Sequence, residues 1–180
     1  MNINKYYTDT FGVTPSQLEA LTATALEHGG DYADLYFEYT TYFNLLLKDG
    51  VVSSGGFHTD FGVGIRVLKG EKTGYAYSES TDMKSMTESA RAASAIAIGT
   101  GTGRTYKPVN DIRHDLYRMK RNWREEGAET FLPFLTSLEK AILSKDSRII
   151  KVIARLSDSV SDVMMYNSLG ELTCDTRPMG

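Results

Sequence analysis

The residues best suited to chemistry in this chain are few and widely separated. The three histidines are His28, His58 and His114, and none belongs to an H-E-x-x-H pair, the helical spacing that brings two imidazoles to one zinc ion. Asp111, His114 and Asp115 offer three possible metal ligands, but their stretch has no fixed helical register, so we interpret it as a solvated loop. We therefore assign no metal ligand and no catalytic residue within these 180 residues.

A single cysteine, Cys174, limits the thiol chemistry of the chain. A cysteine nucleophile needs a neighbouring base, and the sequence indicates no histidine partner, so we interpret Cys174 as a buried strand residue. One cysteine cannot form an internal disulfide, which fits a reducing compartment. No apolar stretch has the length of a signal-peptide core or a membrane span, so we expect a cytoplasmic protein without membrane contact.

The charge of the chain argues against nucleic acid as a partner. Its formal net charge is −3, whereas binding to phosphates needs a concentrated positive surface. One basic cluster surrounds Trp123, and two glutamates follow it at once. The charged residues of this cluster are Arg118, Lys120, Arg121, Arg124, Glu125 and Glu126. We interpret the cluster as a charge-balanced, solvated face and predict no nucleic-acid binding.

Arg66 is the charged residue whose setting points most directly to a binding site. It lies in a run of strand-forming residues, 55–79, that also contains six glycines. A two-residue turn at 70–71 closes a hairpin within this run, and its register sets Val67 opposite Gly74. Because side chains alternate along a strand, this register decides which residues accompany Arg66 on its face.

The two faces of the hairpin differ in character. One is apolar, with low positions where a helix can approach: Val63, Ile65, Val67, Gly74 and Ala76. The other is polar and aromatic: Gly62, Gly64, Arg66, Tyr75 and Tyr77. We expect Tyr77 to lie across Gly64, its partner in this register.

Two interpretations of Arg66 stay open. In the first, Arg66, Tyr75 and Tyr77 line a groove for an extended peptide or a carboxylate. In the second, Arg66 stacks on Tyr75 on an exposed sheet face.

The glycines do not have the setting of a phosphate-binding loop. Such a loop joins a strand to the N-terminus of a helix, where free N–H groups and the helix dipole meet the anion. Gly62 and Gly64 lie inside a strand that leads into a turn. The other glycine run, 99–103, follows a predicted helix and lacks a Lys-Ser/Thr ending. We interpret the strand glycines as positions where backbone or an aromatic ring comes close.

The wider pattern predicts an α+β fold, with a mostly antiparallel sheet and helices packed on one face. The predicted helices span 15–28, 83–98 and 130–144, the last with Leu135, Leu138 and Ile142 turned inward. The other predicted strands span 34–41, 44–54 with a turn at Asp49-Gly50, 148–157, 163–168 and 171–177. Composition divides the chain into an N-terminal domain, a linker and the start of a second region: 1–103, 104–127 and 128–180.

Several of these residues together resemble the N-terminal domain of the TldD/PmbA metallopeptidases. The first set of matching positions is Ala33, Asp34, Asp49, Gly50, Gly62, Gly64, Arg66, Val67, Gly74 and Ala76. A later set resembles the family's N-S-x-G and D-x-R-P patterns, and it comprises Asn167, Ser168, Gly170, Asp175, Arg177 and Pro178. The D-x-R-P ending is similar to the TldD branch. The resemblance covers most of 15–100 and 130–180.

The resemblance implies a protease of small or unfolded peptides, a family once called modulators of DNA gyrase. The family's zinc is held by an H-E-x-x-x-H helix and a later cysteine in a C-terminal domain, and 1–180 contains no such motif. We expect this chain to be the N-terminal and part of the middle region of a longer protein. That piece would wall the cleft, help bind extended peptide and pair with a homo- or heterodimeric partner subunit. The alternative is a stand-alone peptide- or protein-interaction module without protease activity.

Overall fold

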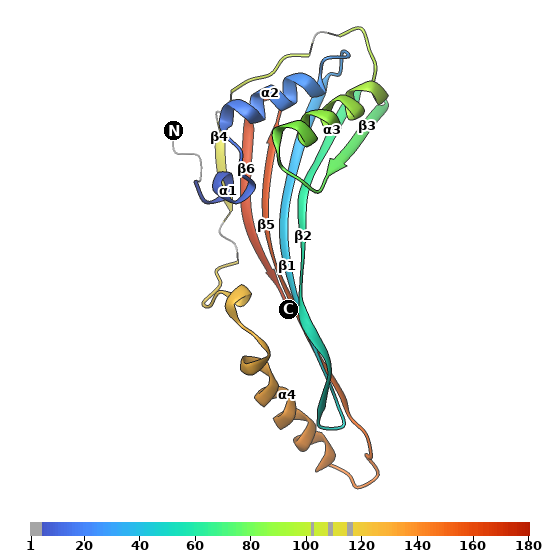
Figure 1. Ribbon diagram of the computed structural model, residues 1–180, viewed down its shortest axis with the longest axis vertical. Coiled ribbons are helices and arrows are strands. Elements are labelled where there is room, and N and C mark those ends of the chain that lie inside the picture. Colours follow the sequence, from blue (N-terminus) through green and yellow to red (C-terminus); the bar gives the residue numbers. More distant parts are fainter. Residues whose placement is uncertain (1–4, 102, 108–109, 115–116) are drawn as a thin grey trace. The chain divides into compact units, whose positions relative to one another are not determined.

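The structure is a computed structural model that describes residues 5–101, 103–107, 110–114 and 117–180. Its strands form a six-stranded sheet in the order β3-β2-β1-β5-β6-β4 (Figure 1). The strands are β1 Tyr32–Lys48, β2 Val51–Lys69, β3 Lys72–Ser78, β4 Asn110–His114, β5 Ile153–Asn167 and β6 Glu171–Met179. The helices are α1 Lys5–Phe11, α2 Pro15–Ala25, α3 Met83–Ile96 and α4 Ala128–Leu143, with a 3-10 turn at Trp123–Glu125.

The sheet is mostly antiparallel. Short turns connect β1 to β2, β2 to β3 and β5 to β6, and strands joined in this way run in opposite directions. The short strand β4 joins the edge of the sheet and runs parallel to β6. This architecture confirms the predicted α+β class. None of the described helices is long and apolar enough to cross a membrane.

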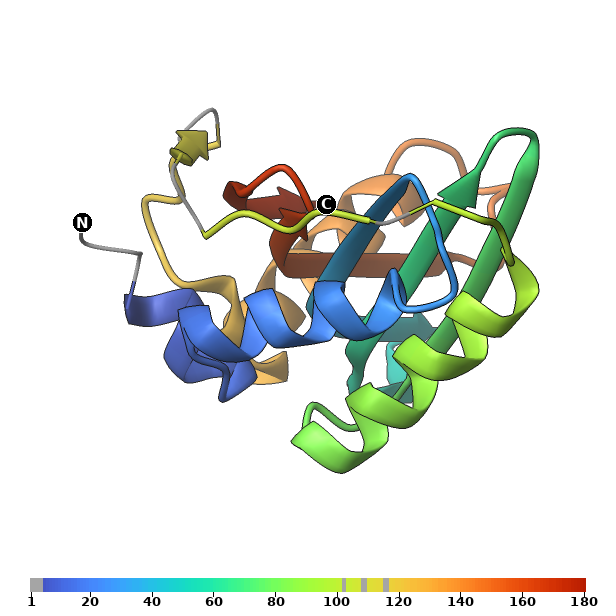
Figure 2. The ribbon, with the colours of Figure 1, turned by 90° about the horizontal axis from the view of Figure 1, so that it is seen from above.

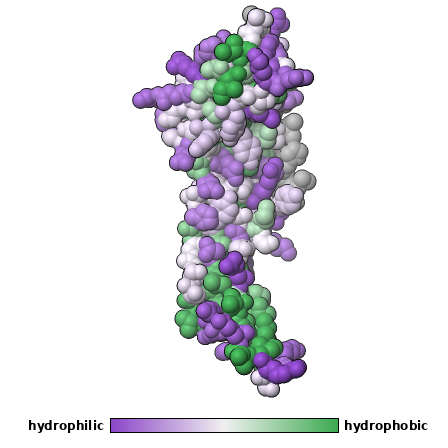
Figure 3. Space-filling view, turned by 90° about the vertical axis from the view of Figure 1, so that its right-hand side faces the viewer, coloured by the Kyte–Doolittle hydropathy of each residue, from purple (hydrophilic) through white to green (hydrophobic). Residues whose placement is uncertain are grey.

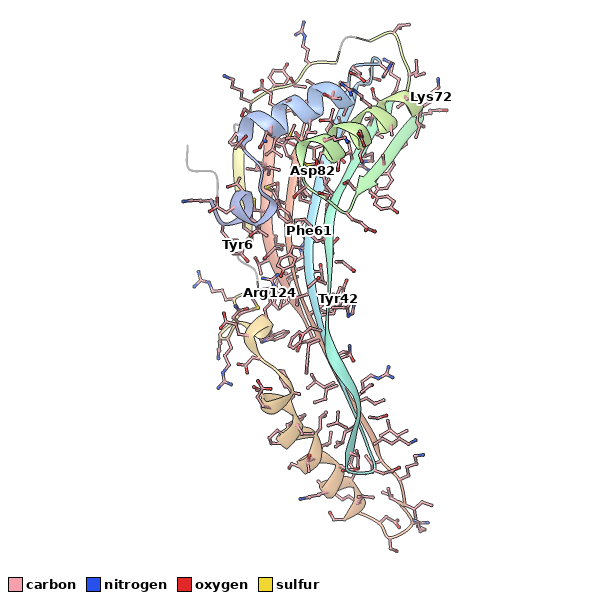
Figure 4. The ribbon with its side chains drawn as sticks, in the orientation of Figure 1. Tyr6, Tyr42, Phe61, Lys72, Asp82 and Arg124 are labelled. Atoms are coloured by element: carbon pink, nitrogen blue, oxygen red, sulfur yellow. The ribbon has the colours of Figure 1, made fainter. Side chains whose placement is uncertain are left out.

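Helices α2 and α3 lie side by side across one face of the sheet (Figures 1 and 2). Helix α2 begins with the capping box that the sequence predicts, in which Thr14 accepts the backbone N–H of Gln17 and the Gln17 side chain bonds back. Helix α3 begins at Asp82, whose carboxylate accepts the N–H groups of Lys84 and Ser85 (Figure 4). The residues of α2 and α3 buried in the core are Leu18, Leu21, Ala25, Met86, Ala90 and Ala93.

The β2–β3 hairpin has the predicted register, with Val67 opposite Gly74. Gly74 lies directly under α3, because a Cβ placed on it would come within 1.9 Å of the Ala93 carbonyl oxygen. The missing side chain therefore lets the helix backbone press onto the strand, as predicted. The β1–β2 turn also agrees with prediction. Asp49 and Gly50 both have positive φ, at 49° and 77°, as a type I′ turn requires.

The strand prediction is wrong at β5. The sequence suggests two strands, 148–157 and 163–168, whereas β5 is one continuous strand. Two polar residues between these segments, Ser161 and Asp162, have partners within the fold. Asp162 is fully buried and accepts hydrogen bonds from Tyr6 and Thr176, each at 2.6 Å (Figure 4 labels Tyr6). Polar side chains that are paired in this way can occupy strand positions, although a sequence pattern alone resembles a break.

By its contacts the chain divides into two compact units whose segments alternate along the sequence. Unit 1 consists of Met1–Tyr39, Phe61–Leu116 and Asp162–Thr176. Unit 2 consists of Thr40–Asp60, Tyr117–Ser161 and Arg177–Gly180. The domain boundaries proposed from composition divide the sequence in another way and stay a prediction.

Unit 2 has its own core beneath α4, and its buried members are Phe43, Leu45, Leu47, Leu135 and Ala154. Leu135 points inward as predicted. The same prediction for Leu138 is wrong, because this residue is 40% exposed. The inward stripe of α4 runs instead through Phe131, Leu135 and Glu139. Glu139 can be buried because its carboxylate accepts the N–H of Gly50 at 2.7 Å. Apolar side chains also gather on the surface of this unit (Figure 3).

Candidate functional site

The sheet of unit 1 has a second face, opposite the one that packs against α1, α2 and α3. Ala33 lies in the core with the helices, so alternation along β1 directs Asp34 to this second face. The register places Arg66 of β2 beside Tyr75 of β3 on the same face. Tyr75 is 57% exposed and Tyr77 is 67% exposed. The three residues predicted to bind substrate are therefore at the surface, where a ligand can reach them.

Arg66 forms a two-pronged ion pair with Asp34. Its Nε donates to Oδ2 at 3.0 Å and to Oδ1 at 3.3 Å, and its Nη2 donates to Oδ2 at 2.5 Å. The Asp34 side chain is only 10% exposed, whereas that of Arg66 is 48% exposed. The hydrogen bond and charge of Asp34 raise the pKa of Arg66. Because this fork uses Nε and Nη2, the Nη1 group points away from Asp34 and can donate to a ligand.

Tyr75 covers Gly64, so the predicted position of Tyr77 over that glycine is wrong. A Cβ on Gly64 would come within 2.7 Å of the Tyr75 hydroxyl oxygen and 3.1 Å of its Cε2. Tyr75 is the diagonal neighbour of Gly64 rather than its direct partner in the register. A tyrosine ring is long enough to reach a diagonal neighbour across two strands, which pairing alone does not reveal.

The remaining motif glycines make close backbone contacts. A Cβ on Gly62 would lie 2.3 Å from the carbonyl oxygen of Ser78, at the end of β3. Gly74 meets α3, as described above. Gly62 and Gly64 lie within β2, which continues into a turn rather than into a helix. Their setting therefore agrees with the interpretation as close-approach positions and not with a phosphate-binding loop.

Asn167 organises the turn between β5 and β6. Its Oδ1 accepts the N–H groups of Leu169 and Glu171 at 3.0 and 3.1 Å, and its Nδ2 donates to the Glu171 carboxylate at 2.7 Å. Ser168 ties the same turn to β1, because its N–H donates to the Ala33 carbonyl oxygen at 2.8 Å. The N-S-x-G pattern thus fixes the end of this hairpin beside Asp34.

The D-x-R-P positions are divided between the two units. Asp175 is buried in β6 within unit 1, and Arg177 is exposed and belongs to unit 2. Cys174 is buried in the helix-facing core, as predicted, with 2% exposure.

A cavity of about 230 Å³ opens on the second face, across β1, β5 and β6. Its lining residues are Asp34, Met165, Tyr166, Asn167, Glu171 and Thr173. The neighbouring Tyr32 has a raised pKa, mainly because it is desolvated and secondly because it lies near Asp34. The cavity thus adjoins the Arg66–Asp34 pair and carries negative charge.

The described residues do not provide a metal centre. They contain no group of three His, Cys, Asp or Glu side chains that could hold an ion. His28 bonds Ser94 at 3.1 Å, and His58 stacks on Tyr42 with ring centroids 4.4 Å apart (Figure 4 labels Tyr42). The side chain of His114, with those of Asp111 and Asp115, lies outside the described residues. The set does not fit zinc, and we derive no step through a metal.

The basic cluster near Trp123 is engaged within unit 2. Arg124 donates to the Thr41 hydroxyl at 3.1 Å and to the Val160 carbonyl oxygen at 3.0 Å (Figure 4 labels Arg124). Arg121 lies 3.9 Å from the Glu126 carboxylate. These contacts support the interpretation of a charge-balanced face.

Sequence reasoning identified Arg66 but missed its partner. The fork to Asp34 is a contact that orients the guanidinium, while the groove and the stacking of Arg66 on Tyr75 both stay predictions. The alternation of side chains along 34–41 could have indicated Asp34 as the partner of Arg66. Asp34 is two residues from Tyr36 and four from Glu38, so all three lie on the polar face of this strand. Glu171 and its bond to Asn167 were also missed, and no pattern in the sequence points to them.

In a comparison with protein families, residues 33–97 match the family described as PmbA/TldA metallopeptidase domain 1. A Metalloprotease TldD homolog of Haemophilus influenzae is 32% identical over 93% of this chain and 36% of its own length. A second TldD homolog, of Buchnera aphidicola, is 28% identical over 82% of this chain and 31% of its own length. The chain therefore spans about a third of the length of these curated relatives.

Solved structures share the fold. TldE of Thermococcus kodakarensis superposes with a TM-score of 0.66 and 15% identity, over 89% of this chain and 37% of that one. A protein of Bacteroides thetaiotaomicron that is named for modulation of DNA gyrase gives a TM-score of 0.70 and 14% identity, over 91% and 38%. At such identities the likeness supports the architecture alone.

Proposed function

The chain belongs to the TldD/PmbA family, and from this we propose that it is the non-catalytic N-terminal portion of a peptide-hydrolysing metallopeptidase. The relatives that carry the name metalloprotease are about three times as long. We assign the hydrolytic chemistry and its metal to residues outside 1–180, because the described side chains do not fit a metal. A partner subunit of the same family and a cytoplasmic location are parts of this proposal.

The proposed task of these residues is to hold extended peptide at the edge strand β3. Among the described strands, β3 is the last on its side of the sheet. The two-residue turn makes Lys69 and Lys72 a hydrogen-bonded pair, so alternation directs the backbone N–H groups of Thr73, Tyr75 and Tyr77 away from β2. A peptide strand can pair with these outward groups.

Arg66 and Tyr75 lie next to this edge on the second face. The fork to Asp34 orients the Arg66 guanidinium through Nε and Nη2, and the Arg66 side chain is 48% exposed. A fixed donor loses less side-chain freedom when it binds a peptide carbonyl or carboxylate. This exposed but oriented guanidinium is the observation that carries the proposal, because it presents a donor that a peptide can reach.

The test measures the binding of fluorescein-labelled ten-residue peptides to the chain by fluorescence anisotropy. We expect N-methylation of alternate peptide residues to weaken binding at least tenfold in one alternation and to leave it unchanged in the other, since one set of N–H groups pairs with β3. Equal effects in both alternations would refute strand addition. Peptide hydrolysis by the chain alone, with or without zinc, would refute the non-catalytic assignment.

Arg66→Lys tests the site residue while it keeps a cation beside Asp34. Lysine preserves the ion pair but has no planar fork with a second donor edge. We expect about tenfold weaker peptide binding with little change in melting temperature. If affinity and melting temperature fall together, Arg66 is structural only.

A further inference from the structure

The cavity on the second face has a lining that suits one kind of side chain. Three adjacent strands contribute to it: Asp34 from β1, Met165 and Asn167 from β5, and Glu171 and Thr173 from β6. Its volume of about 230 Å³ is below the roughly 300 to 1,000 Å³ of sites for whole small ligands. The cavity therefore has room for a single long side chain rather than for a cofactor.

The charges around the cavity favour a cation. Asp34 and Glu171 bring two carboxylates to the lining, and Arg66 balances one of them. Asn167 donates one hydrogen bond to Oε2 of Glu171, and a carboxylate can accept about four. An anionic group entering here would meet uncompensated negative charge, whereas an ammonium or guanidinium would find an acceptor.

The apolar part of the lining favours a cation on a long stem. Met165 is 39% exposed, so its thioether side chain offers apolar surface beside the carboxylates. Lysine and arginine side chains bury their methylene stems on apolar surface while the charged end reaches a polar partner. A bare metal ion does not fit, because the described residues bring no third carboxylate, histidine or thiolate to this place.

We propose that this cavity binds a lysine or arginine side chain of a polypeptide. The site is separate from the β3 edge, since β2 lies between β3 and β1 in the sheet. Its recognition elements are the Glu171 carboxylate for the charge and Met165 for the stem, since Arg66 already balances the charge of Asp34. It can therefore be tested independently of the strand-addition proposal.

The test is a titration of the ¹⁵N-labelled chain with Nα-acetyl-lysine amide, followed by two-dimensional NMR. We expect saturable shifts at the amides of Asn167, Glu171 and Thr173, with millimolar affinity because a single side chain offers little binding energy. Nα-acetyl-norleucine amide, which has the stem without the charge, should bind at least fivefold more weakly. Nα-acetyl-glutamate amide should give no saturable shift.

Two variants complete the experiment. Glu171→Gln keeps the size and the acceptor for Asn167 but removes the charge, so lysine should lose its advantage over norleucine. Glu71→Gln, in the exposed β2–β3 turn, makes the same chemical change elsewhere and should behave as wild type. Equal binding of lysine and norleucine by the wild-type chain would overturn the proposal, as would retained lysine preference in Glu171→Gln or shifts that never saturate.

Discussion

Replacing Gly74 with alanine should destabilise the fold because the new Cβ would clash with the backbone of α3. Gly64 of the same hairpin faces only a side chain, so its replacement provides the comparison. The new Cβ would lie 1.9 Å from the Ala93 carbonyl oxygen, and Cβ atoms essentially never approach within 3.0 Å. The helix or the strand must therefore move by at least 3.0 less 1.9 Å, or 1.1 Å. Movement of α3 disturbs its buried stripe of alanines, so we expect Gly74→Ala to lower the free energy of unfolding by about 3 kcal/mol, the upper part of the range for overpacking.

Two matched substitutions define the comparison. Gly64→Ala meets only the flexible Tyr75 side chain, which can swing outward, so we expect a loss of about 1 kcal/mol or less. Gly56→Ala, within β2, has no atom within 4 Å of the new Cβ. Alanine has less backbone freedom than glycine in the unfolded chain, and it meets no obstacle here in the folded one. Gly56→Ala should therefore leave the free energy of unfolding unchanged or raise it by up to about 1 kcal/mol.

Urea unfolding, followed by far-UV circular dichroism and by Trp123 fluorescence, provides the measurement. Both probes are needed because Gly74 belongs to unit 1 and Trp123 belongs to unit 2, and the two units need not unfold together. A Gly74→Ala loss no larger than that of Gly64→Ala would refute the close approach of α3 to the strand.

Two further predictions concern buried polar groups. Glu139→Ala leaves the Gly50 N–H without its acceptor and should cost about 2 kcal/mol, whereas Glu139→Gln keeps an acceptor and should cost about 1 kcal/mol or less in urea unfolding. Equal losses in the two Glu139 variants would mean that packing, and not the hydrogen bond to Gly50, causes the destabilisation. Burial raises the pKa of Tyr166 to about 12 in the folded chain, so its stabilising contribution is complete below pH 10 and is lost as the pH rises toward 12. Tyr166→Phe has no hydroxyl at this position, so it loses both the titrating group and the bond to the Tyr106 carbonyl oxygen. Its urea midpoint should therefore fall less than that of wild type between pH 10 and 11.5. Parallel plots of urea midpoint against pH for the two proteins would contradict this reasoning.

The sequence predicted the local geometry of the hairpin well. Turn chemistry at 70–71 sets the register, and alternation then assigns Gly74 to the helix face and Arg66 to the other face. The capping box at Thr14 likewise placed the start of α2. These features depend on neighbours in sequence or on a short turn, which is why a pattern reveals them.

Contacts between distant segments were less accessible. The pairing of Arg66 with Asp34 joins residues of two neighbouring strands, and their parity identifies a shared face but not a bond. Helix α1 was not predicted, because its seven residues are too few for a periodic signal and its place depends on Tyr6 reaching Asp162. The continuity of β5 was missed for the same reason, since its polar residues find partners far along the chain.

The alternation of the two units has a consequence for how such a chain can vary. The backbone passes between the units after 39, 60, 116, 161 and 176, so no single cut releases either one intact. The excursion 40–60 begins and ends beside Tyr39 and Phe61, whose rings lie 6.0 Å apart. Because 40–60 supplies Phe43, Leu45 and Leu47 to the core beneath α4, a change in its length is tolerated only where it keeps these side chains on the buried face. Natural length differences in 40–60 among related proteins should therefore come as matched pairs of residues, which keep the alternation of buried and exposed side chains on both strands.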